Sequence, residues 1–194
     1  MKLFLYASVM ILLLAGCNSQ NRSAMEIEMY NVSSDALGTA TISQGANGVD
    51  VKLSLTGLEP GYHGIHVHEF AKCEQPDFQS AGNHLNPDGK VHGLMNPEGA
   101  HLGDLPNIEA DSSGKVEAEL TLPEATLQDG KTSLLRNNGT SLIITAGEDD
   151  GMSQPSGNGG ERIACGKIQL EESNKQDAPS NPAEDGTDQQ KESS

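Results

Sequence analysis

The chain has 194 residues, a length typical of a single domain with a core of ordinary size. Its 28 aspartates and glutamates outnumber its 12 lysines and arginines, which gives a formal net charge of −16. A protein this acidic lacks the basic surface with which proteins bind the phosphates of nucleic acids. The composition therefore excludes DNA and RNA from the expected partners.

The first residues are predicted to be a lipoprotein signal peptide that spans residues 1–16. The apolar run from Leu3 to Leu14 is short for a transmembrane helix and is typical of an export signal. Leu14-Ala-Gly-Cys17 resembles the lipobox of bacterial lipoproteins, in which the cysteine is acylated and becomes the new N-terminus. An ordinary cleaved signal that contains a cysteine is the alternative. Lipidation of Cys17 would anchor the protein to the bacterial cell membrane, facing outside the cytoplasm.

The remaining chain divides into three predicted parts. Residues 17–24 are the lipidated cysteine and a polar tether, and residues 25–170 are the folded domain. Residues 171–194 consist mainly of polar and acidic residues, without aromatic or β-branched aliphatic side chains. Such a tail cannot bury apolar surface, so we expect it to be disordered. Cleavage after residue 16 would remove one lysine and change the net charge from −16 to −17.

The predicted domain is rich in β-strands and contains no convincing helical stripe. Apolar and polar residues alternate, or strand-forming residues cluster, in five segments: Glu26–Tyr30, Val49–Leu55, Lys115–Leu122, Ser141–Ala146 and Arg162–Leu170. Short strands separated by glycine and proline favour a β-sandwich or barrel. One long segment, Phe70–Asp111, has no strand pattern. A loop of that length is uncommon unless something orders it.

All six histidines of the chain lie between positions 63 and 101. His66 and His68 stand two positions apart, so on a strand they would project from the same face, although two surface histidines are the simpler interpretation. The other three candidates lie in the long loop, with an aspartate after the last: His84, His92, His101 and Asp104. Three imidazoles and one carboxylate suit a closed, four-coordinate zinc site that would cross-link the loop. Solvated side chains are the alternative for each histidine alone.

Two cysteines remain after Cys17 is assigned to the lipid. Cys73 and Cys165 are an even pair in a protein expected outside the cytoplasm, where disulfides persist. A bridge would tie the long loop to the last strand and stabilise the fold by roughly 4 to 5 kcal/mol in the chain-entropy model. Two buried free thiols are the alternative.

These features together carry a family resemblance. The chain resembles the Cu/Zn superoxide dismutases, most closely their exported bacterial branch, in four segments: residues 63–70 (HGIHVHEF), 80–87 (SAGNHLNP), 101–107 (HLGDLPN) and 160–166 (GERIACG). The resemblance implies an all-β fold, a Greek-key β-sandwich described as a flattened eight-stranded barrel with long metal-binding and electrostatic loops. It also implies superoxide as the substrate.

The resemblance assigns a role to each candidate residue. His66, His68 and His84 would bind copper, and His84 would bridge to a zinc ion completed by His92, His101 and Asp104. His63 corresponds to a structural histidine. Cys73 and Cys165 would form the family disulfide, and Arg162 would guide the anion toward copper. Asp149 stands where the family has an aspartate that links a copper histidine to a zinc histidine, and a solvated carboxylate is its alternative.

The sequence departs from the family at one copper ligand. The run Leu142-Ile-Ile-Thr145-Ala-Gly places a threonine where the last copper histidine is expected. A neutral hydroxyl is a poor ligand for soft Cu(I). In the family mechanism the bridging imidazolate leaves copper on reduction and takes up a proton, which here would leave only His66 and His68. Our hypothesis is therefore an intact zinc site beside a low-affinity or vestigial copper site.

Four functions remain open from sequence. The first is a superoxide dismutase-like envelope lipoprotein with weak or lost activity. The others are an active enzyme that protects the cell surface, a zinc-stabilised scaffold that binds copper, and an interaction protein that has kept the fold. The sequence does not predict whether the protein is a monomer or a dimer.

Overall fold

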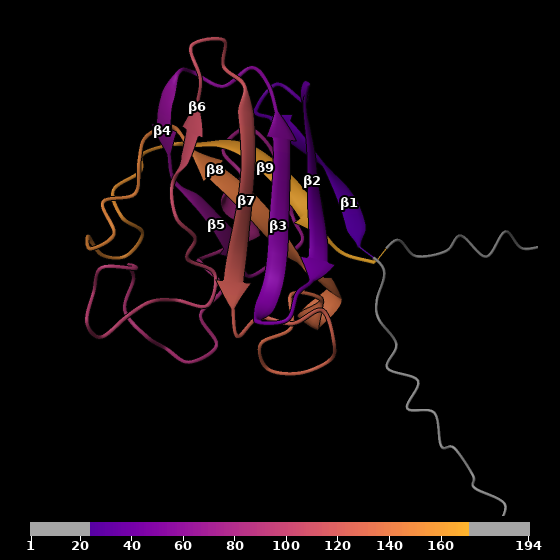
Figure 1. The fold of residues 1–194 in the computed structure, drawn as a ribbon, viewed down its shortest axis with the longest axis vertical. Coiled ribbons are helices and arrows are strands. Elements are labelled where there is room, and N and C mark those ends of the chain that lie inside the picture. Colours follow the sequence, from indigo (N-terminus) through magenta and orange to yellow (C-terminus); the bar gives the residue numbers. More distant parts are fainter. Residues whose placement is uncertain (1–23, 171–194) are drawn as a thin grey trace, which may run out of the picture.

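The computed structural model describes residues 24–170 (Figure 1). The predicted signal, Cys17 and the tail after residue 170 lie outside these residues. The described part contains nine strands and two short 3₁₀ helices: β1 (Met25–Asn31), β2 (Ala36–Gln44), β3 (Gly48–Leu55), β4 (Gly61–His63), β5 (Ile65–His68), η1 (Gln79–Ala81), β6 (Ile108–Ala110), β7 (Val116–Pro123), η2 (Arg136–Asn138), β8 (Thr140–Thr145) and β9 (Arg162–Ile168). Among residues 24–170, no helix has the length and apolarity needed to cross a membrane.

Seven strands form one antiparallel sheet in the order β5-β8-β9-β1-β2-β3-β7, and β4 pairs with β6 in a small second sheet. Only Gly64 separates β4 from β5, and β6 is followed closely by β7. The small sheet therefore connects β5 and β7, the two edge strands of the large sheet, which curls (Figure 1). Neighbours such as β3 and β7, or β5 and β8, are far apart in sequence, as in Greek-key connections. The all-β prediction is confirmed, and counting β4 and β5 as one run gives the eight strands of the expected barrel.

The core follows from strict alternation along the strands. In β3, four alternate side chains are buried and the polar ones between them face solvent. These side chains pack with those of β2, β7 and β8 into one main cluster. Burial of each such aliphatic side chain stabilises the fold by about 1.5–3 kcal/mol. The alternation therefore fixes which face of each strand points inward.

The long segment Phe70–Asp111 contains more regular structure than its sequence suggests. It contains η1 and, near its end, the three-residue strand β6, whose His63↔Ile108 pairing places β6 against β4. The expectation of no strand there is thus wrong for Ile108–Ala110. Strand β2 was also not predicted, although it occupies a central place between β1 and β3.

Two long loops lie on the same side of the barrel (Figure 1). We call residues 69–107 the metal-binding loop and residues 146–161 the electrostatic loop. The disulfide between Cys73 and Cys165 joins the metal-binding loop to β9 with a Cα–Cα distance of 5.7 Å, which confirms the predicted pairing. The loops meet at the histidine-rich end of β5, where the candidate site lies.

Candidate metal centre

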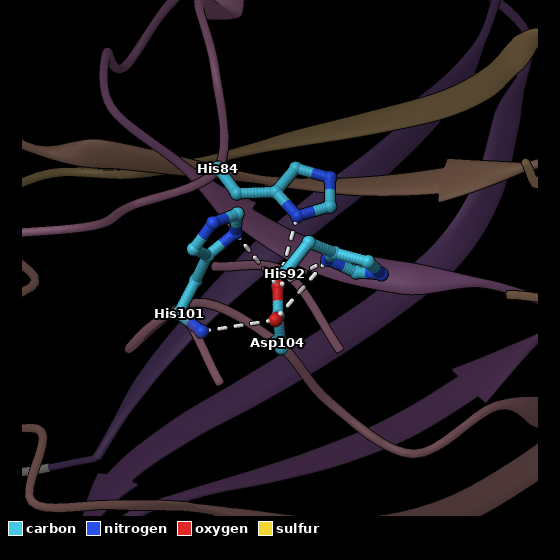
Figure 2. A group of neighbouring side chains, drawn as sticks. All are labelled: His84, His92, His101 and Asp104. Atoms are coloured by element: carbon cyan, nitrogen blue, oxygen red, sulfur yellow. Dashed lines mark hydrogen bonds and ion pairs between the residues drawn. The ribbon is translucent and has the colours of Figure 1, made fainter. Parts of the chain in front are cut away.

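Four predicted zinc ligands converge on one point (Figure 2). The Oδ1 atom of Asp104 lies 2.9 Å from Nδ1 of His84, 3.2 Å from Nδ1 of His92 and 3.3 Å from Nδ1 of His101. Ligand atoms around tetrahedral zinc are separated by roughly 3.3 Å, given bonds of about 2.0 to 2.1 Å. The three imidazole nitrogens therefore lie close to the distances from the Asp104 oxygen that a zinc shell requires, and all four ligand atoms lie within 4.8 Å of one another.

The second oxygen of Asp104 is held by the main chain. Its Oδ2 accepts hydrogen bonds from the backbone N–H groups of Gly93 at 2.9 Å and His101 at 3.0 Å. This leaves Oδ1 directed at the three imidazoles. Gly103 allows the loop to approach β5 closely, because a Cβ atom there would lie 2.2 Å from the carbonyl oxygen of Val67.

The electrostatics of this cluster favour a bound cation. Burial raises the pKa of Asp104, but hydrogen bonds with the three imidazoles outweigh it and hold that pKa far below the ordinary value, so the carboxylate is ionised. Burial lowers the pKa of His84 to about 4, which favours the neutral, metal-binding imidazole. Burial also acts to lower the pKa of His92, but hydrogen bonds with Asp104 and Asp149 raise it to about 9.

The predicted copper ligands form a second buried cluster of His66, His68 and His84, with one ligand nitrogen of each within 4.8 Å of the others. Nδ1 of His68 lies 3.0 Å from the carbonyl oxygen of Gly82, so its Nε2 is the nitrogen left for a metal. Burial lowers the pKa of His68 well below its ordinary value and keeps the ring neutral. His84 faces the zinc-type cluster with Nδ1, which leaves its Nε2 for the second cluster.

Asp149 links the two clusters. One carboxylate oxygen lies 2.7 Å from Nε2 of His66, and the other lies 3.0 Å from Nε2 of His92. Burial raises the pKa of Asp149, but the hydrogen bonds with both histidines lower it by more. The net pKa is below the ordinary value, so Asp149 is an anion between the two rings. Nδ1 of His66 is fully buried and has no hydrogen-bond partner, as expected of a nitrogen reserved for a metal. Asp149 is thus not a solvated carboxylate.

Thr145 lies beside the copper-type cluster but turns its hydroxyl toward the main chain. The hydroxyl lies 2.9 Å from the carbonyl oxygen of Gly147, to which it donates, and 3.3 Å from that of Gly64. Gly64 separates it from the ring of His66, because a Cβ at Gly64 would lie 2.6 Å from the Thr145 hydroxyl and 3.2 Å from Cε1 of His66. Thr145 also pairs in register with Arg162 of β9, whose side chain lines a pocket with His84.

His63 is placed apart from both clusters. Its Nδ1 and Nε2 each lie 2.8 Å from a main-chain carbonyl oxygen, those of Thr145 and Glu59 respectively. The side chain is 2% exposed and belongs to none of the described groups that could hold a metal ion. This arrangement agrees with a structural histidine that braces the end of β8.

Arg162 lines a pocket of about 350 Å³ that reaches His84 and His101. Its guanidinium donates hydrogen bonds to the carbonyl oxygens of Phe78 and Gly82, each at 2.9 Å. Burial lowers the pKa of Arg162 below its ordinary value, and the guanidinium remains a cation at neutral pH. Glu69 lines the same pocket and opposes this positive charge.

The donor sets allow a test of the two implied metals. Three imidazole nitrogens and one carboxylate oxygen, preformed around one point, fit zinc. Three imidazoles suit copper as well, but the described residues offer no fourth nitrogen there. The buried His/Asp clusters are therefore consistent with the copper and zinc sites of the family that the sequence resembles.

Two amide side chains at the site were missed from sequence, Asn107 and Gln154. Asn107 donates to the carbonyl oxygen of Asp149 at 2.8 Å, and its own oxygen accepts from the Asp149 N–H at 2.9 Å. Gln154 forms an equivalent pair of bonds with His92. Amides are common in loops, and they have no titration or ligand signature that would have singled them out.

Comparisons with known proteins agree with this geometry. The family described as Copper/zinc superoxide dismutase (SODC) matches residues 36–168. The Cu-Zn superoxide dismutase 2 of Aquifex aeolicus (strain VF5) is 44% identical over 160 residues, which cover 81% of this chain and 93% of that protein.

Solved structures show the same relationship. The crystal structure of a SOD-like protein from Bacillus subtilis has a TM-score of 0.73 and 37% identity, with 75% of this chain and 99% of that chain covered. The Cu/Zn superoxide dismutase from Brucella abortus has a TM-score of 0.64 and 31% identity, with 76% and 100% covered. The chain belongs to the copper/zinc superoxide dismutase family.

Proposed function

We propose that this protein is a superoxide dismutase-like protein with a complete zinc site and an incomplete copper site, in which conversion of superoxide to oxygen and hydrogen peroxide is weak or lost. The observation that carries the proposal is Thr145, which lies across Gly64 from the ring of His66 and directs its hydroxyl to a main-chain carbonyl. The histidine expected at this position would have supplied a fourth nitrogen.

The zinc half rests on the convergence of His84, His92, His101 and Asp104. Three imidazole nitrogens lie 2.9 to 3.3 Å from Oδ1 of Asp104, and two backbone N–H groups fix its Oδ2. A bound zinc ion would cross-link the metal-binding loop and order the wall of the adjacent copper-type cluster.

The copper half would retain its metal poorly during turnover. Bound copper would supply the one-electron oxidation and reduction of superoxide. His66 and His68 would hold it through Nδ1 and Nε2, together with Nε2 of His84. Whenever a proton occupies Nε2 of His84, only two imidazoles remain, and the hydroxyl of Thr145 is a hard donor unsuited to Cu(I).

Arg162 is proposed to attract the superoxide anion into the pocket above His84. Its guanidinium is the one cation among the side chains that line this pocket in the described part of the chain. Two carbonyl oxygens hold it in place, so little side-chain entropy is lost when an anion binds. The strongly acidic chain and Glu69 weaken the attraction, because the local field adds their charges to that of Arg162.

The proposal is tested by Thr145→His, with Thr145→Val as the matched control. After copper and zinc loading, copper affinity and dismutation are measured for both variants and the unchanged protein. Thr145→His should raise both quantities together by at least tenfold, because it restores a nitrogen ligand. Thr145→Val preserves the shape without adding a ligand and should change neither. An unchanged protein as active as a family member with all its histidines would contradict the proposal.

A second candidate function is a zinc-stabilised scaffold that binds copper without turnover. It is favoured by the three buried imidazoles, whose remaining nitrogens lie close enough to share an ion. A copper titration of the unchanged protein separates the candidates. Tight, stoichiometric copper binding without dismutation supports the scaffold, whereas weak binding supports a vestigial site.

The location of the domain is proposed to be the outer face of the bacterial cell membrane, through lipid on Cys17. The support is the Leu14-Ala-Gly-Cys17 sequence after an apolar run. Cys17→Ser should move the protein from the membrane fraction to the soluble extracytoplasmic fraction. Membrane association that persists in this variant would contradict the lipid anchor.

A further inference from the structure

The backbone of one zinc-type ligand is held by a side chain from the other loop. The N–H of His92 donates to Oε1 of Gln154 at 2.9 Å, and the carbonyl oxygen of His92 accepts from Nε2 of Gln154 at 2.9 Å. A single amide thus satisfies both main-chain groups of a residue whose side chain is fully buried. The carbonyl oxygen also accepts a longer bond, at 3.3 Å, from Asn96.

Both ring nitrogens of His92 face a carboxylate, and the backbone of His92 determines whether the ring can reach both. Nδ1 faces Asp104 within the zinc-type cluster, and Nε2 faces Asp149. A shift of the His92 main chain would change both distances at once. Among the described residues, Gln154 is the side chain that bonds both the N–H and the carbonyl oxygen of His92. It is therefore placed to set the position of the His92 ring.

Gln154 itself is held rigidly. Its Nε2 also donates to the carbonyl oxygen of Met152 at 3.0 Å. The surrounding turn is closed by a bond from the Gly157 N–H to the Ser153 carbonyl oxygen at 2.7 Å. The carboxylate of Asp150 caps the same turn through the backbone N–H of Ser153.

The two loops touch closely on either side of this amide. A Cβ at Gly93 would lie 2.0 Å from the carbonyl oxygen of Gly151. A Cβ at Gly157 would lie 2.7 Å from Nε2 of His92. Gln154 therefore lies at a contact where the electrostatic loop and the metal-binding loop leave no room for independent movement.

We propose that Gln154 is a positioning residue for His92, which it holds from the electrostatic loop so that the zinc-type site keeps its geometry. Zinc affinity would then depend on a residue that contacts no metal. The inference rests on the zinc site of the proposed function. Partners of this kind, which orient a metal ligand, typically change metal affinity 10- to 100-fold when removed.

The test compares Gln154→Ala with Gln154→Glu and with Gln128→Ala as a control. Gln154 is exposed, so its truncation leaves the core intact, and Gln128 is another exposed loop glutamine. Zinc affinity is measured by competition with a chelator, and the visible absorption of bound Co²⁺ reports ligand geometry. Gln154→Ala should bind zinc roughly 10 to 100 times more weakly and alter the Co²⁺ spectrum.

The conservative variant sharpens the result. Glutamate at position 154 keeps an acceptor for the His92 N–H but loses the donor to the carbonyl oxygen, so its affinity should lie between those of Gln154→Ala and the unchanged protein. If the alanine variant does not fold, weaker zinc binding by Gln154→Glu than by the unchanged protein and by Gln128→Ala decides the matter. Equal zinc affinity and equal Co²⁺ spectra in the variants at position 154 and in Gln128→Ala would overturn the inference. Failure of the unchanged protein to bind zinc would instead overturn the proposed function.

Discussion

The carboxylate of Asp149, a residue that is only 9% exposed, lies 2.7 Å from Nε2 of the fully buried His66. Because the other carboxylate oxygen reaches His92, a residue of the electrostatic loop connects the copper-type and zinc-type clusters. The bond also fixes which nitrogen of His66 remains for a metal. The two clusters should therefore respond together when this connection is broken.

Asp149→Asn is expected to weaken metal binding at both clusters. An asparagine keeps the shape but loses the negative charge that holds two imidazoles. Zinc affinity should fall roughly 10- to 100-fold, and copper binding should weaken with it. Competition titrations with both metals measure the effect. Glu148→Gln, a neighbouring exposed carboxylate, should change neither, and independent behaviour of the two sites in Asp149→Asn would count against the link.

Removal of zinc should lower the thermal stability of the domain. At a free zinc concentration 100 times the dissociation constant, binding stabilises the folded state by about 2.7 kcal/mol. For a domain of this size the melting temperature would fall by roughly 5 to 10 °C. Calorimetry with and without a chelator measures the shift. In His101→Ala the shift should largely disappear, and an identical shift in that variant would show that zinc acts elsewhere.

Loss of the disulfide should destabilise the fold and loosen the anion pocket. Replacement of Cys73 by serine and Cys165 by alanine removes a bridge that closes a long loop, at a cost of about 2–5 kcal/mol. Urea denaturation measures this cost. Arg162 depends on carbonyl oxygens of the same loop, so hydrogen exchange near Phe78 and Gly82 should increase. Unchanged exchange there would show that the loop is ordered without the bridge.

Gly157→Ala should disrupt the contact between the loops. Its added methyl group would lie 1.8 Å from a carboxylate oxygen of Asp149, so the loop must move away from the site. Gly160→Ala is the control, because Gly160 also has a positive φ but has no atom within 4 Å of the added Cβ. Zinc affinity should fall at least tenfold in Gly157→Ala only. An equal loss in both variants would indicate backbone strain instead of the steric contact.

The sequence allows the fold class and the clustered ligands to be predicted, for clear physical reasons. Alternation in Val49–Leu55 reflects one buried face, and it correctly located β3. A metal shell needs several ligands at one point, so three loop histidines followed by Asp104 predicted the cluster that these four residues form. The pairing of Cys73 with Cys165 followed from the resemblance and from the even count.

The remaining features depend on tertiary context. In β2 the buried residues are Leu37, Ala40 and Ile42, which do not follow a strict two-residue period, and glycine and alanine are depleted in strands. Strand β6 has three residues and exists because β4 pairs with it. The roles of Asn107 and Gln154 come from contacts across two loops, and no local pattern encodes such contacts.

The central claim is that Thr145 leaves the copper site incomplete. The most direct measurement is the rate of superoxide dismutation by the unchanged protein loaded with zinc and copper, with the bound copper counted in the same sample. We predict a rate per bound copper at least tenfold below that of Thr145→His under the same conditions. Equal rates per bound copper in the two proteins, at the level of a fully liganded family member, would contradict the account.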